Sequence, residues 1–224
     1  MDVGNAFVYM REDKDWVNKF VVASVLALTF IGLIPLTGWL IEITHRVIKK
    51  EPQPIPDWSD FGEYTLSGLK LILLTLVWGL PMGIIYFPYI FISILGPLMS
   101  EFNPQIAEGP IFAFFMLTMF CFTPLIFLMQ AVLMFFYPAF KGNFATTKDI
   151  NDGFAFRKIF SMVKANWANY LVVGIIGMWV PSMLATAGMF LFCIGYFPAM
   201  VYGLMVGAHL EGQVYLDTQA KLAS

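Results

Sequence analysis

The chain has 224 residues, of which 59% are hydrophobic and only 12% are charged, and its formal net charge is −2. Soluble domains usually carry about 25% charged residues, so this composition excludes a water-soluble globular fold. The small net charge gives no support for a nucleic-acid partner. We therefore expect an integral membrane protein that forms one membrane domain over residues 1–224.

Four stretches contain no Asp, Glu, Lys or Arg, namely 20–41, 71–100, 109–140 and 165–210. A spanning helix needs about 20 apolar residues, so the first three stretches can hold one span each and the fourth can hold two. The apolar segments are expected at about 20–47, 70–99, 110–140, 168–187 and 189–210. Proline and glycine recur inside them, which membrane helices tolerate. The predicted fold class is an all-α, polytopic membrane helical bundle with kinked or re-entrant helices.

Two polar segments have the pattern of amphipathic helices lying in the membrane interface. In 152–167, one helical face carries Phe156, Ile159, Phe160, Val163 and Trp167, and the opposite face carries basic and hydroxyl residues. The segment 57–69 follows Pro56 and has acidic residues where a helix N-terminus favours them. Residues 2–19 form a weaker third case, with Phe7, Tyr9 and Trp16 as candidate anchors.

Lysine and arginine are concentrated in two connections, 46–70 and 141–168, whereas 100–110 contains none. Positively charged loops stay on the cytoplasmic side, so we expect 46–70 and 141–168 to be cytoplasmic and 100–110 to be external. The side of the membrane on which the N-terminal tail lies depends on how the first apolar segment crosses the bilayer. It either crosses once, placing the tail outside, or turns back at 32–35, placing the tail inside, which the charge count favours.

A short sequence pattern occurs twice, at 31–35 and at 194–198, as Ile-Gly-x-x-Pro. Each copy is followed 13 or 14 residues after its glycine by a histidine, His45 or His209. Internal repeats are common in transporters and in other membrane proteins that duplicate helix pairs. A true repeat and a chance match both remain possible from the sequence.

Four stretches of the chain together resemble a known family. They are DWVNKF at 15–20, PDWSDFGE at 56–63 with GLK at 68–70, FRKIF at 156–160 with NWANY at 166–170, and AHLEGQVY at 208–215. Their order and spacing resemble the prokaryotic membrane family known as domain of unknown function 4013. This resemblance implies a multi-pass protein of a bacterial or archaeal cytoplasmic (inner) membrane. It implies no activity and no catalytic or binding residues.

Five polar residues in or beside the apolar segments are candidate functional residues: Glu42, His45, Gln130, His209 and Glu211. Ionisable residues within membranes often serve a function. Glu42 and His45 are three residues apart on one helical face and could bind a metal, but such sites need further carboxylates from other helices. We therefore expect these groups to make structural hydrogen bonds, with a proton relay or metal site as the alternative. Gln130 is either an interhelical hydrogen-bonding group or a substrate contact.

No phosphate-binding glycine loop, nucleophile elbow, HExxH motif or catalytic carboxylate pair is present in the sequence. We therefore expect no enzymatic activity and no cofactor or metal; a bound lipid fits the composition, and a pigment or quinone is disfavoured. The expected function is a non-catalytic membrane subunit, scaffold or assembly component. Its partners would be the bilayer and other membrane subunits or further copies of itself. A transporter or channel is the first alternative, and an interfacial lipid-binding protein or enzyme is the second.

Overall fold

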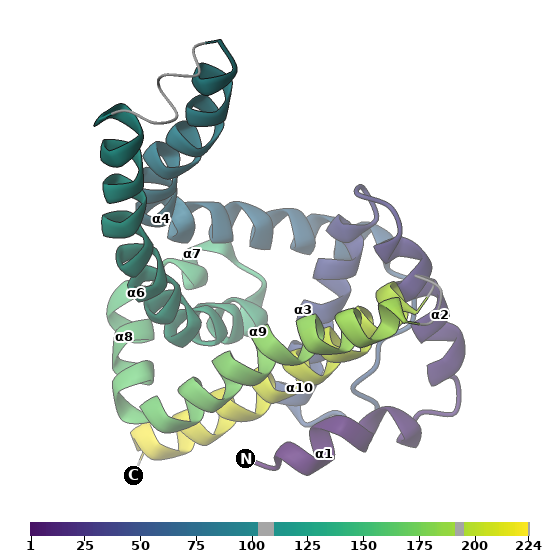
Figure 1. Cartoon of the computed structure of the whole chain (residues 1–224). Coiled ribbons are helices and arrows are strands. Elements are labelled where there is room, and N and C mark those ends of the chain that lie inside the picture. The colour runs from purple at the N-terminus through teal and green to yellow at the C-terminus, as the bar shows by residue number, and fades with distance from the viewer. Residues whose placement is uncertain (103–109, 191–194, 224) are drawn as a thin grey trace. The chain divides into compact units, whose positions relative to one another are not determined.

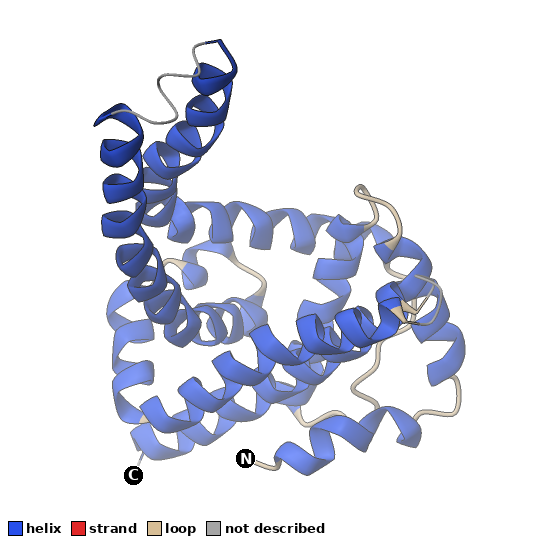
Figure 2. Ribbon diagram, in the orientation of Figure 1, coloured by secondary structure: helices blue, strands red, loops and turns tan. Residues whose placement is uncertain are grey.

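The computed structural model describes residues 1–102, 110–190 and 195–223, and every regular element within them is a helix (Figure 2). The all-α class predicted from the sequence is confirmed. The elements are α1 (Val3–Val8), the 3-10 helix η1 (Tyr9–Glu12), α2 (Trp16–Ala27), α3 (Leu33–Lys49), α4 (Phe61–Phe102), α6 (Pro110–Thr147), α7 (Ile150–Gly153), α8 (Phe156–Ala165), α9 (Trp167–Met189) and α10 (Tyr196–Ala223) (Figure 1).

The chain divides into two compact units. The main unit comprises residues 1–74 and 134–224, and the second unit comprises residues 75–133. The second unit contains the C-terminal part of α4, from Thr75, and the N-terminal part of α6, to Leu133.

Three helices in the described residues are long and apolar enough to cross a membrane, over Phe61–Phe87, Met116–Thr147 and Trp167–Met189. They correspond to three of the five apolar segments expected from the sequence. Of the fifth segment, expected at 189–210, residues 191–194 lie outside the described residues, and the part from Tyr196 lies in α10, which continues through polar residues to Ala223. Prolines lie inside these long helices, for example Pro181 in α9.

The core of the main unit is built around α10. Helices α9 and α10 pack against each other along much of their length, and α3 packs against α10 (Figure 1). The hydroxyl of Thr44 on α3 donates to the carbonyl of Ala208 on α10 over 3.1 Å. Thr44 and Ala208 immediately precede the two histidines that the sequence pattern aligns, so the two helices meet at corresponding positions of the possible repeat.

The N-terminal segment lies along α10. The amino group of Met1 is 2.7 Å from the carboxylate of Asp217, and the hydroxyl of Tyr9 donates to the carbonyl of Met205 over 3.2 Å. Tyr9 was a candidate membrane anchor, yet it is only 1% exposed. Its ring is instead stacked on His209. This aromatic side chain therefore contributes to the core of the main unit.

The apolar segment 20–47 is two helices, α2 and α3, separated by residues 28–32. The backbone N–H of Gly32 donates to the hydroxyl of Thr29, and a Cβ at Gly32 would lie 2.3 Å from the Leu26 carbonyl. The tight turn therefore requires glycine. Pro35 falls in the first turn of α3, where a missing N–H costs no hydrogen bond. The break thus precedes the proline instead of centring on it.

Residues 57–69 do not form a helix of their own, which differs from the sequence expectation. Residues 58–60 form a turn, and α4 begins at Phe61 and continues without interruption through the following apolar run. The amphipathic pattern correctly predicted a helix, which covers this segment from Phe61 onward. However, nothing after residue 69 ends the helix, so the interfacial segment and the span are continuous.

The amphipathic segment 152–167 is interrupted as well. A short helix, α7, ends at Gly153, and α8 covers Phe156–Ala165. The expected apolar face divides in two. Ile159 and Val163 pack inside the main unit, whereas Phe156, Phe160 and Trp167 remain exposed. A Cβ at Gly153 would lie 2.3 Å from the side chain of Leu74, so the end of α7 packs closely against α4.

This division predicts different effects for two changes on α8. Val163→Asp should destabilise the protein by more than about 2 kcal/mol, because it buries a carboxylate without a partner. Phe160→Asp should leave the detergent-solubilised fold within about 1 kcal/mol of the wild type and reduce membrane association instead. Denaturation in detergent and liposome flotation separate the two effects. Equal destabilisation by both variants would contradict the division of this face.

Candidate functional site

Glu42 lies on α3 one helical turn before Arg46, and the two side chains form an ion pair. The Arg46 guanidinium Nε is 3.0 Å from a Glu42 carboxylate oxygen, in the i, i+4 spacing that helices favour. Glu42 is 9% exposed, so most of its charge is removed from water. A carboxylate this buried requires cations to compensate it.

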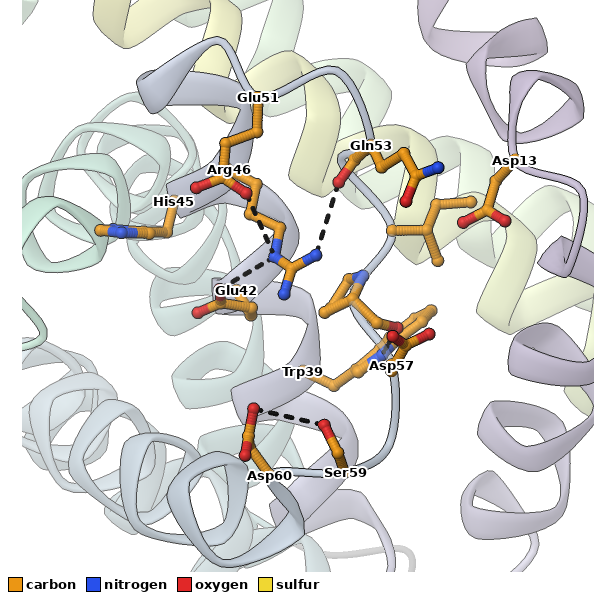
Figure 3. Close-up of polar contacts among 12 residues, drawn as sticks. Asp13, Trp39, Glu42, His45, Arg46, Glu51, Gln53, Asp57, Ser59 and Asp60 are labelled. Atoms are coloured by element: carbon orange, nitrogen blue, oxygen red, sulfur yellow. Dashed lines mark hydrogen bonds and ion pairs between the residues drawn. The ribbon is translucent and has the colours of Figure 1, made fainter.

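Arg46 has a second set of contacts, created by the end of α3. Lys50 adopts a left-handed conformation with φ of 56°, which ends the helix and turns the chain back. The Glu51 carboxylate then lies 3.6 Å from Arg46 Nε, and an Arg46 terminal nitrogen donates to the Gln53 carbonyl over 3.5 Å (Figure 3). The guanidinium therefore holds the connection after α3 against the helix.

Lys148, just beyond α6, supplies the second cation for Glu42. Its ammonium lies 2.6 Å from the Glu42 carboxylate and also pairs with Glu63 near the start of α4. Lys148 has φ of 58°, and the Lys70 ammonium donates to its carbonyl over 3.1 Å. We call this network the charged junction and define it as Glu42, Arg46, Glu51, Glu63 and Lys148.

The pKa of Lys148 lies above its ordinary value of 10.5. Burial of the ammonium acts to lower this pKa, but the hydrogen bonds to Glu42 and Glu63 outweigh that effect. A raised lysine pKa stabilises the fold below the pKa of the unfolded chain, and this stabilisation is lost as pH rises through the folded-state pKa. Lys148 therefore stays charged at neutral pH, and its ion pairs should weaken only in strongly alkaline solution.

A separate buried ion pair joins α6 to α10. The Lys141 ammonium is 2.6 Å from the Glu211 carboxylate, and the two side chains are only 8% and 5% exposed. Lys141 also lies 5.7 Å from the centre of the Tyr137 ring. Both charges are removed from water, so each depends on the other for compensation.

His45 and Lys148 extend the contacts of the last turns of α6. The Nδ1–H of His45 donates to the Ala145 carbonyl over 2.6 Å. Lys141, Ala145 and Lys148 are spaced by four and three residues, which places them on one helical face. Along this face, Lys141 contacts α10, and Ala145 and Lys148 contact α3. The end of α6 is therefore fastened to both central helices of the main unit.

The His209 side chain packs against an aromatic ring and contacts one side-chain amide. Its ring stacks on Tyr9 with centres 4.2 Å apart, and the Gln213 side-chain amide lies 3.1 Å from Nδ1. The same Gln213 side chain bonds the backbone of Asp2 through both its oxygen and its nitrogen. His209 thus helps to hold the N-terminal segment on α10.

The structure brings four of the five sequence candidates to the region where α3, α10 and the end of α6 meet. These are Glu42, His45, His209 and Glu211, whereas Gln130 is half-buried on α6 in the second unit. Glu42 and His45 do not converge on a shared point. Figure 3 shows the His45 ring directed away from Glu42 and Arg46. Within the described ranges, no group of three or more His, Cys, Asp or Glu side chains is arranged to hold a metal.

The partners of these candidates were not identified from the sequence. Lys141 and Lys148 were counted only as positive charges that orient a loop, although both bind carboxylates of other helices. Their spacing in the sequence from Glu42 and Glu211 gives no indication of contact. Arg46 was recognisable, because it follows Glu42 by four residues on a predicted helix.

Long apolar helices and buried ion pairs between helices define a polytopic α-helical membrane protein. The chain belongs to the family described as "Protein of unknown function (DUF4013)", whose model matches residues 21–194. The family suggested by the four sequence stretches is therefore confirmed. No curated protein matches the chain, and no solved structure matches it.

Proposed function

We propose that this protein is a non-catalytic subunit or scaffold of a larger membrane complex and acts by association. The observation that carries the proposal is that the polar candidates of the main unit are engaged by neighbours within the same chain. Glu42 is paired with two cations, and Glu211 is paired with Lys141. A substrate or a transported ion would have to displace these internal partners.

The apolar surface supports association. In the second unit, several large side chains are exposed on the isolated chain, including Ile84 (74%), Phe87 (70%), Phe120 (77%) and Phe127 (71%). Phe120 and Phe127 are seven residues apart and lie on one face of α6. Such a face can contact lipid or the helices of another membrane subunit.

Variants on this face test the association. Phe120→Ala together with Phe127→Ala should remove copurifying subunits, or dissociate an oligomer, after extraction in a gentle detergent. Leu125→Ala, which truncates an exposed side chain elsewhere on α6, is the matched control and should leave the complex intact. Complex composition is measured by size-exclusion chromatography and mass spectrometry. A wild-type protein that purifies alone as a monomer would contradict the proposal.

A transporter is distinguished from this proposal by three polar variants, Gln130→Leu, Glu42→Gln and His209→Leu. Association predicts that these variants leave the composition of the complex unchanged. Glu42 and His209 lie in the main unit, and Gln130→Leu replaces a side chain next to Phe127 by an apolar one. Transport predicts a solute flux by the purified protein in vesicles that at least one variant abolishes. Such a flux would overturn the proposal of a non-catalytic subunit.

We further propose that the protein resides in a prokaryotic cytoplasmic membrane with 46–70 and 141–168 on the cytoplasmic side. The contacts of the charged junction support a common side, since Lys148 pairs with Glu63 and receives a hydrogen bond from Lys70. Single cysteines at Ser59, Ser100 and Ser161 test this in intact cells. Only the cysteine at position 100 should react with an impermeant thiol reagent, and labelling at either other position would contradict the orientation.

A further inference from the structure

A pocket of about 430 Å³ lies where the N-terminal segment separates from α10. The segment is held along α10 by Tyr9 and by the Tyr202 hydroxyl, which donates to the Phe7 carbonyl over 2.8 Å. Beyond this bond the chain turns into α2, and Trp16 and Phe20 of α2 also line the pocket. Binding pockets for small ligands typically have volumes of about 300–1,000 Å³.

The lining of the pocket is apolar apart from a single charged side chain. Met10 and Leu184 contribute aliphatic surface, as do Pro198 and Ala199 near the start of α10. Arg11 is the charged residue of the lining, and it is exposed. A hydrocarbon chain fits this lining by the hydrophobic effect, and the guanidinium can bind a phosphate through two hydrogen bonds.

The acidic side chains nearby do not neutralise Arg11. Asp13 and Asp57 both pair with the Lys19 ammonium, at 2.7 Å and 2.9 Å. Glu12 and Asp15 are exposed and are not part of the lining. Within the described residues, Arg11 has no ion-pair partner, so its charge remains available to an anion at the mouth of the pocket.

The pocket adjoins tryptophan and charged side chains of the kind found at membrane interfaces. Trp16 packs against Phe20, and the Trp58 indole nitrogen donates to the Lys19 carbonyl over 3.0 Å. Tryptophans beside charged groups are characteristic of membrane interfaces. An apolar pocket lined by one cation and adjoined by tryptophans suits a membrane lipid as its ligand.

We propose that this pocket binds an anionic phospholipid, with an acyl chain between α2 and the start of α10 and the phosphate group at Arg11. The proposal does not depend on the function proposed above, because either a scaffold or a transporter could hold a structural lipid. It identifies the ligand by class, a membrane phospholipid with net negative charge. A zwitterionic lipid should bind less well because its headgroup carries no net charge to interact with Arg11.

Native mass spectrometry of the detergent-purified protein tests the proposal, using phosphatidylglycerol and phosphatidylcholine as separate probes. The wild type should bind one phosphatidylglycerol at least about fivefold more tightly than phosphatidylcholine. Arg11→Gln should reduce this preference to less than about twofold, whereas Arg157→Gln, which alters an exposed cation on α8, should preserve it.

A second variant tests the acyl-chain part of the site. Ala199→Phe places a ring in the pocket and should lower binding of both lipids by about tenfold. Ala187→Phe, on an exposed position of α9 outside the lining, should have no such effect. Equal binding of the two lipids by the wild type, or unchanged phosphatidylglycerol binding in Ala199→Phe, would overturn the proposal. Circular dichroism establishes that each variant is folded.

Discussion

Replacing Lys141 by methionine is expected to destabilise the protein by about 3–5 kcal/mol. Methionine nearly preserves the length of the side chain but removes the charge that compensates Glu211 at 2.6 Å. Because Glu211 is only 4% exposed, its carboxylate cannot regain water without disrupting the contacts between α6 and α10. Denaturant unfolding in mild detergent, followed by tryptophan fluorescence, measures the loss.

The double variant Lys141→Met/Glu211→Leu separates the cost of an unpaired charge from the value of the pair itself. Replacing both partners by apolar residues is often neutral or stabilising, so the double variant should recover most of the stability. Lys164→Met removes an exposed cation on α8 and should change stability by less than about 0.5 kcal/mol. A double variant as unstable as Lys141→Met would contradict the assignment of Glu211 as the unpaired group.

The charged junction should respond less strongly than the Lys141–Glu211 pair. Glu42 has two cationic partners, so the loss of Lys148 leaves Arg46 at 3.0 Å to compensate the carboxylate. Glu63 and Glu51 are also more exposed and can be hydrated. The Lys141–Glu211 pair therefore has one partner on each side, whereas the charged junction is a partly hydrated network that has several.

The sequence predicted the helical class, the apolar segments and the family, because each depends on composition, periodicity or local pattern. A turn at 32–35, which Gly32 and Pro35 signal locally, was one of the two alternatives that the sequence left open for 20–47. The sequence did not predict that 57–69 continues into α4, because an amphipathic pattern that becomes uniformly apolar has no signal for the boundary. Helix ends that depend on the next segment are inherently difficult to predict.

The candidate residues were identified correctly as polar groups near the ends of apolar segments, but their partners were not. Contacts such as Lys141 with Glu211 join residues 70 positions apart, and no periodic pattern encodes such a distance. Likewise, the apolar helical face predicted for 152–167 includes both Ile159 and Phe160. Only the packing of the main unit determines that Ile159 is buried and Phe160 is exposed. The long-range pairs could therefore be identified only from the tertiary structure, whereas the chemical type of each group could be identified from the sequence.

Gly38 and Gly68 mark the closest approach of α3 to the first turns of α4. A Cβ at Gly38 would lie 1.7 Å from the Tyr64 carbonyl oxygen, and one at Gly68 would lie 1.9 Å from the Ile34 carbonyl oxygen. The obstructing atoms belong to backbone, which cannot move aside by changing a rotamer. Small residues at such crossings allow membrane helices to pack in direct contact.

Gly38→Ala is therefore expected to separate α3 from α4 and to destabilise the protein by about 3 kcal/mol or more, at or above the usual upper range for overpacking. Gly62→Ala, in the first turn of α4, adds its Cβ where no atom lies within 4 Å and should be neutral or slightly stabilising, since alanine has a higher helix propensity than glycine. Separation would also move Glu63 away from Lys148 and disturb the stacked rings of Trp39 and Trp58. Unfolding in detergent measures the loss of stability, and the tryptophan emission maximum measures the change at the stacked rings. A Gly38→Ala protein with wild-type stability and emission would show that α3 and α4 do not approach each other this closely.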